Sequence, residues 1–193
     1  MINYSSIYLL FFILISNVNF IYSQNNEENK MLNEVKSRFA GKIQSSAFKE
    51  GEKIPSKFTC DGENVSPQLS WSDFPSNTKT FALIVDDPDA PGGTFVHWVV
   101  YNLPSNVTSL PEGTTSKNLP KGTVQGTNHF GDNDYGGPCP PAGTHRYYFK
   151  LYALDSVIEI KPGGGKRDLL KAMEGHILAE AQLMGKYERN KKS

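Results

Sequence analysis

Short runs rich in aromatic and β-branched residues alternate with clusters of Gly, Pro, Asn and Asp along most of this sequence. Side chains of the first kind favour strands and those of the second favour turns, so each run predicts one strand. A chain built this way folds as a β-sandwich or barrel rather than as a helical bundle. The predicted strands are Gln68 to Trp71, Thr80 to Asp86, Thr94 to Asn102, and His145 to Leu154.

Two of these runs indicate which side chains share a face, because strand side chains alternate between the two faces of a sheet. In the run that begins at Thr94, alternation puts one set on one face (Phe95, His97, Val99 and Tyr101) and a second set behind it (Val96, Trp98 and Val100). Both sets are largely apolar, which predicts a central strand. In the last run His145 and Tyr147 share a face and therefore point the same way.

Near the C-terminus, apolar residues recur at spacings of three and four, the period of an α-helix. They are Leu170, Met173, Ile177, Ala181 and Met184. We therefore expect one amphipathic helix from about Arg167 to Glu188, which follows a glycine-rich breaker and packs on a sheet. Together with the strands, this pattern predicts a mostly β fold with a C-terminal helix.

The first residues of the chain are typical of an export signal. Ile7 to Ile15 form an apolar run of the length found in secretory signals, and a polar stretch follows at Ser23. We predict a signal peptide over residues 1–24, a tether or short helix over 25–40 and one domain over 41–193. The mature protein would be secreted or periplasmic and would have no membrane span. The alternative is an uncleaved anchor, since Phe20 to Tyr22 lengthens the apolar stretch.

The charge balance excludes one class of partner. The chain carries 20 Lys and Arg residues against 20 Asp and Glu residues, so its formal net charge is zero. Proteins that capture nucleic acid or anionic membranes by charge carry an excess of basic residues. We therefore expect no nucleic-acid partner.

Three segments combine polar side chains with residues that stiffen the backbone. In Asp86–Pro91, two prolines make a rigid turn directly after an apolar run. His97-Trp98 places an imidazole on a largely apolar face. Tyr135–Tyr147 is a Gly/Pro loop that runs into a strand, and glycine lets backbone N–H groups approach a ligand closely. Alone, each segment also reads as a turn or a core histidine. Together they predict a small anion pocket.

In order and spacing, these segments resemble the signature blocks of the phosphatidylethanolamine-binding protein family, in its bacterial-type, Raf kinase inhibitor-like branch. The resemblance extends from about Phe58 to Arg189 and implies a two-sheet β-fold with a cavity for phosphate, acetate or a phosphoethanolamine head group. Its blocks are Phe58-Thr59-Cys60-Asp61-Gly62-Glu63-Asn64-Val65-Ser66-Pro67, Leu69-Ser70-Trp71, Asp87-Pro88-Asp89-Ala90-Pro91, His97-Trp98, Gly137-Pro138 with Pro141, His145-Arg146-Tyr147 and the helical segment Ala172 to Glu180.

Carried over position by position, the resemblance implies a set of ligand-binding residues. Imidazoles near a bound phosphate favour their protonated form, and a tyrosine hydroxyl donates a hydrogen bond to the anion. An ionised Asp87 cannot donate, so it would orient a histidine or meet the ammonium end of a zwitterionic head group. The implied residues are Asp87, His97, Gly137, Pro138, His145 and Tyr147.

The sequence gives no positive support for catalysis. It contains no Gly-x-Ser-x-Gly elbow and pairs no nucleophile with a base, so we expect a protein that is not an enzyme and needs no cofactor. Hydrolysis of a phosphate ester is the weaker alternative. Asp87, His97 and His145 have the composition of a metal site with two histidines and one carboxylate, but their separations are long and we expect no metal.

Cys60 and Cys139 both lie in the resembling blocks. Export favours a disulfide between them, and two free buried thiols are the alternative. We expect a non-enzymatic exported protein that binds a small anion or a phospholipid head group. The alternative is an inhibitor or regulator that acts through its surface on a protein target, a protease or a kinase, as some family members are held to do.

Overall fold

The computed structural model describes residues 22, 24–31 and 41–189, and the chain divides into two compact units, Met1–Phe39 and Ala40–Ser193. In the first unit, residues 24–31 are helical. The predicted signal peptide, residues 1–24, lies outside the described residues apart from residues 22 and 24. In the part of the chain that is described, no helix is both long and apolar enough to cross a membrane.

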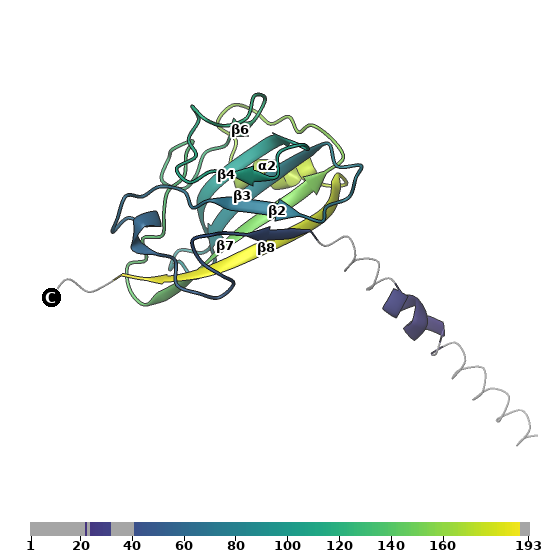
Figure 1. The fold of residues 1–193 in the computed structure, drawn as a ribbon, viewed down its shortest axis with the longest axis horizontal. Helices are drawn as coiled ribbons and strands as arrows, with labels where there is room; N and C mark the ends of the chain where they lie inside the picture. Colours follow the sequence, from purple (N-terminus) through teal and green to yellow (C-terminus); the bar gives the residue numbers. More distant parts are fainter. Residues whose placement is uncertain (1–21, 23, 32–40, 190–193) are drawn as a thin grey trace, which may run out of the picture. The chain divides into compact units, whose positions relative to one another are not determined.

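The second unit is built on two antiparallel sheets (Figure 1). The smaller has the order β1 (Lys42–Gln44), β2 (Leu69–Ser72), β5 (Ser109–Leu110), and the larger has the order β6 (Val124–Gln125), β4 (Phe95–Pro104), β3 (Thr80–Asp87), β7 (Thr144–Leu154), β8 (Ile177–Glu188). The predicted mostly β, two-sheet fold is confirmed. The four predicted strands correspond to β2, β3, β4 and β7, with each end placed within two residues.

The core has two parts, one on each face of the larger sheet. On one face, Leu83 of β3 belongs to a cluster that includes Trp71 of the smaller sheet. On the other face, Ile84 packs in a cluster with Leu169 of helix α2 (Lys166–Met173). The larger sheet is therefore the middle layer of the domain. All eight residues of β3 are buried, in agreement with the apolar run from Phe81 to Val85, which is apolar on both faces.

The predicted helix over Arg167 to Glu188 is wrong in its second half. The helix ends at Met173, and Gly175, with a φ of +80°, turns the chain so that the N–H of His176 donates to the carbonyl of Met173. From Ile177 on the chain is strand β8, which pairs with β7 along the whole length of that strand. The helical spacing of the apolar residues was overridden because β7 offers a long edge to pair with.

The end of β3 carries two buried carboxylates that serve different layers. Asp86 forms ion pairs with Lys150 of β7, at 2.9 Å, and with Lys166 at the start of α2. The next residue, Asp87, points to the opposite face and bonds His145 of β7. Strand β3 therefore uses Asp86 to hold α2 on one face of the sheet. It uses Asp87 to fix His145 in the layer between the two sheets.

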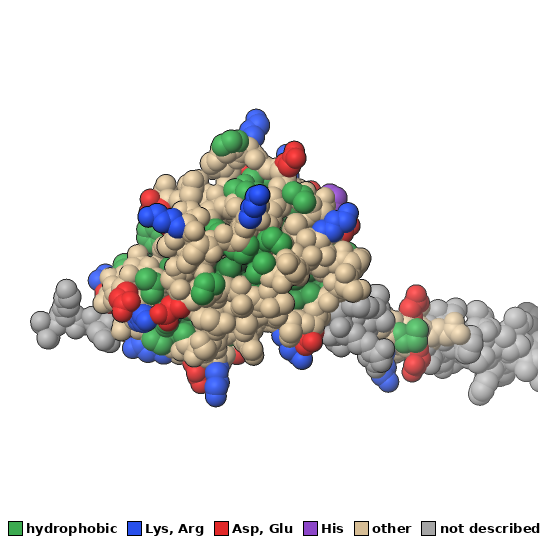
Figure 2. Space-filling view, turned by 45° about the horizontal axis from the view of Figure 1, so that its top comes forward, with side chains coloured by type: hydrophobic (Ala, Val, Ile, Leu, Met, Phe, Trp, Pro, Cys, Tyr) green, Lys and Arg blue, Asp and Glu red, His purple; other side chains and the backbone are tan. Residues whose placement is uncertain are grey.

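Charges of both signs are mixed on the face of the molecule that Figure 2 shows. Blue and red side chains lie scattered around hydrophobic side chains near the middle of the view. Within that view, the described residues form no continuous basic surface that would attract a polyanion.

Candidate functional site

A cavity of about 390 Å³ opens where the ends of β3, β4 and β7 meet. Its polar side chains come from all three strands and from the loops beside them, and most of the remaining wall is proline, glycine and phenylalanine. The residues that line it are Asp87, Ala90, Pro91, Gly92, Gly93, Thr94, Phe95, His97, His129, Phe130, Cys139, Pro140, Pro141, His145 and Tyr147. Four of the six predicted ligand-binding residues, Asp87, His97, His145 and Tyr147, are thus brought together.

His97 reaches the cavity because strand β4 contains a bulge. Val85 pairs with Trp98 and Asp86 pairs with Val96, so His97 is the extra residue. A bulge of this kind re-aims side chains near a site. Trp98 belongs to the core between the sheets. His97 lies in the same layer, where the centroid of its ring is 5.2 Å from that of Tyr147.

The bulge also corrects the predicted facing of this strand. Val99 and Tyr101 lie in the core on the α2 side with Val96, so they do not share a face with His97. Simple alternation fails here because the extra residue shifts the pattern by one.

The ring of His97 is buried and fixed in orientation. Its Nδ1 donates to the carbonyl of Gly136 at 2.7 Å, and only 3% of the residue is exposed. Burial lowers the pKa of His97 below its ordinary value of 6.5, although the Gly136 carbonyl opposes this shift. At neutral pH the ring is therefore neutral, and Nε2 is the nitrogen left for another partner.

His145 is held by a carboxylate. Its Nδ1 lies 2.7 Å from Oδ2 of Asp87, and both side chains are buried. The other oxygen of Asp87 accepts a hydrogen bond from the N–H of Asp89 at 2.8 Å. Both carboxylate oxygens are engaged, so Asp87 acts on the cavity by orienting the imidazole.

A second pair, Asp89 with Arg146, fixes the turn that follows Asp87. Asp89 accepts hydrogen bonds from the backbone N–H, Nε and an NH2 group of Arg146 at 2.9, 2.8 and 2.6 Å. The hydrogen bonds of the guanidinium hold the pKa of Asp89 down at about 2. His145 and Arg146 are consecutive in β7. They therefore bind Asp87 and Asp89, and so hold the end of β3 and the turn after it against β7.

Tyr147 supplies a buried hydroxyl with no hydrogen-bond partner among the described residues. Burial, followed by the nearby charge of Asp87, raises the pKa of Tyr147. The phenol therefore stays protonated at neutral pH and keeps its capacity to donate. Tyr135 differs, because its buried hydroxyl donates to the carbonyl of Phe58 at 2.9 Å.

These two tyrosines give a matched test of the hydroxyl of Tyr147. Tyr135→Phe is expected to lower the free energy of unfolding by about 1–3 kcal/mol, because it leaves the buried Phe58 carbonyl unpaired. Tyr147→Phe removes a hydroxyl that has no partner to lose, so its stability should stay within about 0.5 kcal/mol of the parent. Urea unfolding of both variants measures the difference. Equal losses would contradict the absence of a partner for Tyr147.

The two remaining predicted ligand-binding residues, Gly137 and Pro138, do not line the cavity. The N–H of Gly137 donates to Oδ1 of Asn64 at 2.8 Å, and the carbonyl of Pro138 accepts from the N–H of Cys60 at 3.1 Å. A Cβ on Gly137 would lie only 2.4 Å from the Phe58 carbonyl oxygen. The close approach that requires glycine is to the chain around Cys60, so the contacts of both residues in this structure are with that segment.

The aromatic residues of the cavity wall that the sequence did not predict are Phe95, His129 and Phe130. The ring of Phe95 lies 5.3 Å from that of His129 and 4.8 Å from that of Phe130. The loop that carries the last two is tied to β4 by a hydrogen bond from the N–H of His129 to the carbonyl of Val96, at 2.9 Å. No local sequence pattern predicts this contact, because it depends on long-range hydrogen bonds to β4, which include a second one from the N–H of Gly126 to the carbonyl of Val99.

Within residues 22, 24–31 and 41–189, no group of three or more His, Cys, Asp and Glu side chains has an arrangement that could hold a metal ion. Asp87 and His145 bond each other, and the Nδ1 of His97 is taken by a carbonyl.

Together, the fold and the cavity define a class: two-sheet β proteins with a small pocket built around two buried histidines. The family model described as phosphatidylethanolamine-binding protein matches residues 44–188. The chain belongs to the phosphatidylethanolamine-binding protein family.

Relatives and solved structures agree with this assignment. A UPF0098 protein of Methanothermobacter thermautotrophicus is 52% identical over 148 residues, which cover 76% of this chain and 98% of the relative. The crystal structure of CT736, a phosphatidylethanolamine-binding protein homologue from Chlamydia trachomatis, is 46% identical, covers 79% of this chain and 99% of that one, and superposes with a TM-score of 0.73. YbcL of E. coli is 36% identical, with coverages of 78% and 99% and a TM-score of 0.73.

Proposed function

We propose that the cavity binds a small oxyanion, either free phosphate or the phosphate of a lipid head group, and that the protein is a binding protein rather than an enzyme. The observation that carries this proposal is the convergence of two imidazoles that are each fixed through Nδ1, His97 by a carbonyl and His145 by a carboxylate. Both rings line the same cavity, so their Nε2 atoms are the nitrogens available to a ligand there.

The chemistry of these groups suits an anion. A protonated imidazole donates a charge-assisted hydrogen bond from Nε2, and such bonds to phosphate oxygens are about twice as strong as neutral ones. The hydroxyl of Tyr147 adds a donor without a partner of its own among the described residues. Apolar walls such as Phe95 and Pro140 reduce the competition from water for these bonds.

The test is the pH dependence of sulfate binding, since sulfate does not titrate near neutrality. The free protein has a lowered pKa at His97, whereas a bound dianion favours the imidazolium and raises that pKa. At a pH between the pKa of His97 in the free protein and its pKa in the complex, the complex holds more protons than the free protein. The affinity for sulfate should therefore rise by up to about tenfold for each unit by which the pH falls. It should level off below the pKa of the free protein. Calorimetric titrations between about pH 5 and pH 8 measure this slope, and an affinity independent of pH would sink the proposal.

We also propose that the protein is exported, as the apolar run Ile7 to Ile15 indicates. A bond between Cys60 and Cys139 is in keeping with an oxidising compartment. Mass spectrometry of the protein from its own source checks this: a mature chain that begins near residue 25 supports export, and an uncut chain confined to the cytoplasm contradicts it.

A further inference from the structure

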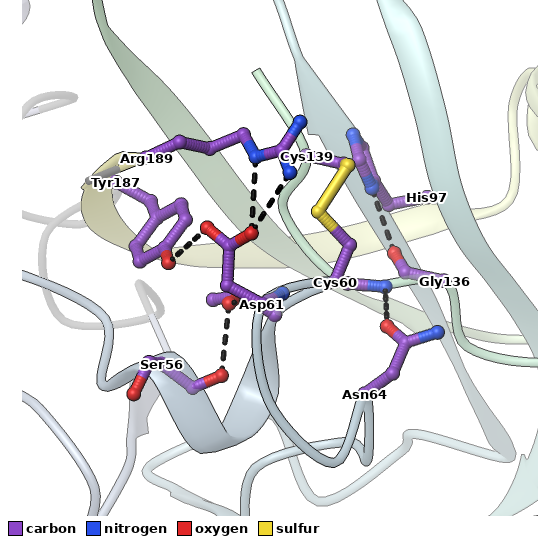
Figure 3. Close-up of a disulfide and its surroundings, with 11 residues drawn as sticks. Ser56, Cys60, Asp61, Asn64, His97, Gly136, Cys139, Tyr187 and Arg189 are labelled. Carbon is purple, nitrogen blue, oxygen red and sulfur yellow. Dashed lines mark hydrogen bonds and ion pairs between the residues drawn. A yellow bond between two sulfur atoms is a disulfide. The ribbon is translucent and has the colours of Figure 1, made fainter. Parts of the chain in front are cut away.

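One wall of the cavity is attached to the rest of the domain through the segment around Cys60. Figure 3 shows the disulfide between Cys60 and Cys139 in these surroundings. Two hydrogen bonds accompany it, from the N–H of Gly137 to Oδ1 of Asn64 and from the N–H of Cys60 to the carbonyl of Pro138. The disulfide is the covalent member of this set, so it limits how far residues 136–141, here called the wall loop, can move.

The segment around Cys60 is itself anchored to the end of β8. Asp61 accepts hydrogen bonds from the hydroxyl of Tyr187 at 2.8 Å and from Nε of Arg189 at 3.0 Å (Figure 3). Tyr187 is buried in the core between the sheets. The segment around Cys60 is therefore held rigidly, and the disulfide from Cys60 restrains the wall loop in turn.

The wall loop acts directly on the atoms that would meet a ligand. Its first residue, Gly136, provides the carbonyl that fixes the ring of His97, as Figure 3 shows. Cys139, Pro140 and Pro141 line the cavity themselves. If the loop moves, the cavity changes shape and His97 loses the acceptor that sets its orientation.

The disulfide is open to reduction because Cys60 is exposed, whereas Cys139 is half-buried. A thiolate of a small dithiol would attack Sγ of Cys60, break the S–S bond and release Cys139 as a thiolate. The second thiol of the reagent then displaces the mixed disulfide, so the reagent leaves oxidised and the protein gains two electrons and, at completion, two protons. The cavity then holds a thiol or thiolate in place of a cross-link.

We propose that the Cys60–Cys139 disulfide is a redox control on the cavity: oxidised protein binds the anion, and reduction by a dithiol weakens binding by freeing the wall loop. The proposal rests on the anion-binding function proposed above. The reduced domain remains folded, because the pairings of β3 with β4 and β7, and of β7 with β8, do not pass through residues 136–141.

The experiment compares sulfate titrations of the oxidised and the reduced wild-type protein at one pH, followed by NMR of the histidine rings. Reduction with dithiothreitol is expected to weaken the affinity by about tenfold, less than the loss of a donor, because His97 is misaligned and not removed; reoxidation should restore the affinity. The variant Cys60→Ala/Cys139→Ala should bind weakly with or without the reductant. Asn64→Gly loosens the same loop with the disulfide intact and should weaken binding by a smaller factor, since glycine suits the φ of +56° at this position.

Each outcome decides one of the two proposals. Equal affinity of the oxidised and reduced forms overturns the redox control and leaves anion binding standing. Failure of both forms to bind sulfate overturns anion binding and the control that rests on it. Loss of the dispersed NMR spectrum on reduction also overturns the control, because the switch requires a folded reduced domain.

Discussion

Replacing His145 by alanine is expected to weaken the binding of inorganic phosphate by about a hundredfold and to lower the free energy of unfolding by about 3 kcal/mol. The first effect follows from the loss of a donor to a charged ligand, worth up to about 3 kcal/mol. The second arises because Asp87 is only 3% exposed and would keep a buried charge without its imidazole partner. That charge would also repel the anion from the emptied site.

His176 provides the control. It has the same contact as His145, with Nδ1 lying 2.8 Å from the carboxylate of Asp155, but the pair is half-exposed and lies away from the cavity. His176→Ala should leave phosphate binding unchanged and cost at most about 1 kcal/mol. Adding Asp87→Asn to His145→Ala should restore part of the lost stability without restoring binding. Phosphate affinity retained by folded His145→Ala protein would contradict the assignment of the cavity.

Removing both cysteines is expected to lower the free energy of unfolding by roughly 4 kcal/mol. The bonded residues are 79 apart in sequence, and closing a loop of that size in the unfolded chain accounts for a loss of this order in the chain-entropy interpretation. Urea unfolding of Cys60→Ala/Cys139→Ala measures it, and wild-type protein in excess reductant should unfold at a midpoint close to that of the variant. A difference below about 1 kcal/mol between oxidised and reduced wild-type protein would contradict this stabilisation by the disulfide.

The strands were predictable because their signal is local. The residues of β3 from Phe81 to Val85 form an uninterrupted apolar run, and turn-forming residues follow the strand at Pro88 and Pro91. The two- and three-residue strands β1, β5 and β6 are too short to show a pattern. Strand β8 carried two patterns at once, since Leu183, Gly185 and Tyr187 alternate as in a strand while other apolar residues follow a helical period. The free edge of β7 favoured the strand, and a single sequence does not show that edge.

The part of the site that depends on residue type and on strand alternation was predictable from the sequence. His145 and Tyr147 share a face as expected, and Asp87 is the last residue of β3, where the N–H of Asp89 holds its carboxylate. The orientation of His97 depends on a bulge, and the position of His129 depends on hydrogen bonds between its loop and β4. Both features arise from pairing between distant segments, which sequence periodicity does not encode. For the same reason the contacts of Gly137 and Pro138 with the chain around Cys60 were not predictable from the sequence.

The opposed side chains of Asp86 and Asp87 have a consequence for protein engineering. One attaches α2 through Lys166 and the other orients a cavity histidine, although they are neighbours on the same strand. A redesign that trims or re-registers the end of β3 would therefore remove an ion pair that holds the start of α2 and misalign the imidazole in the same step. Grafting this pocket onto another scaffold would require the helix lysine to be transferred together with the histidines.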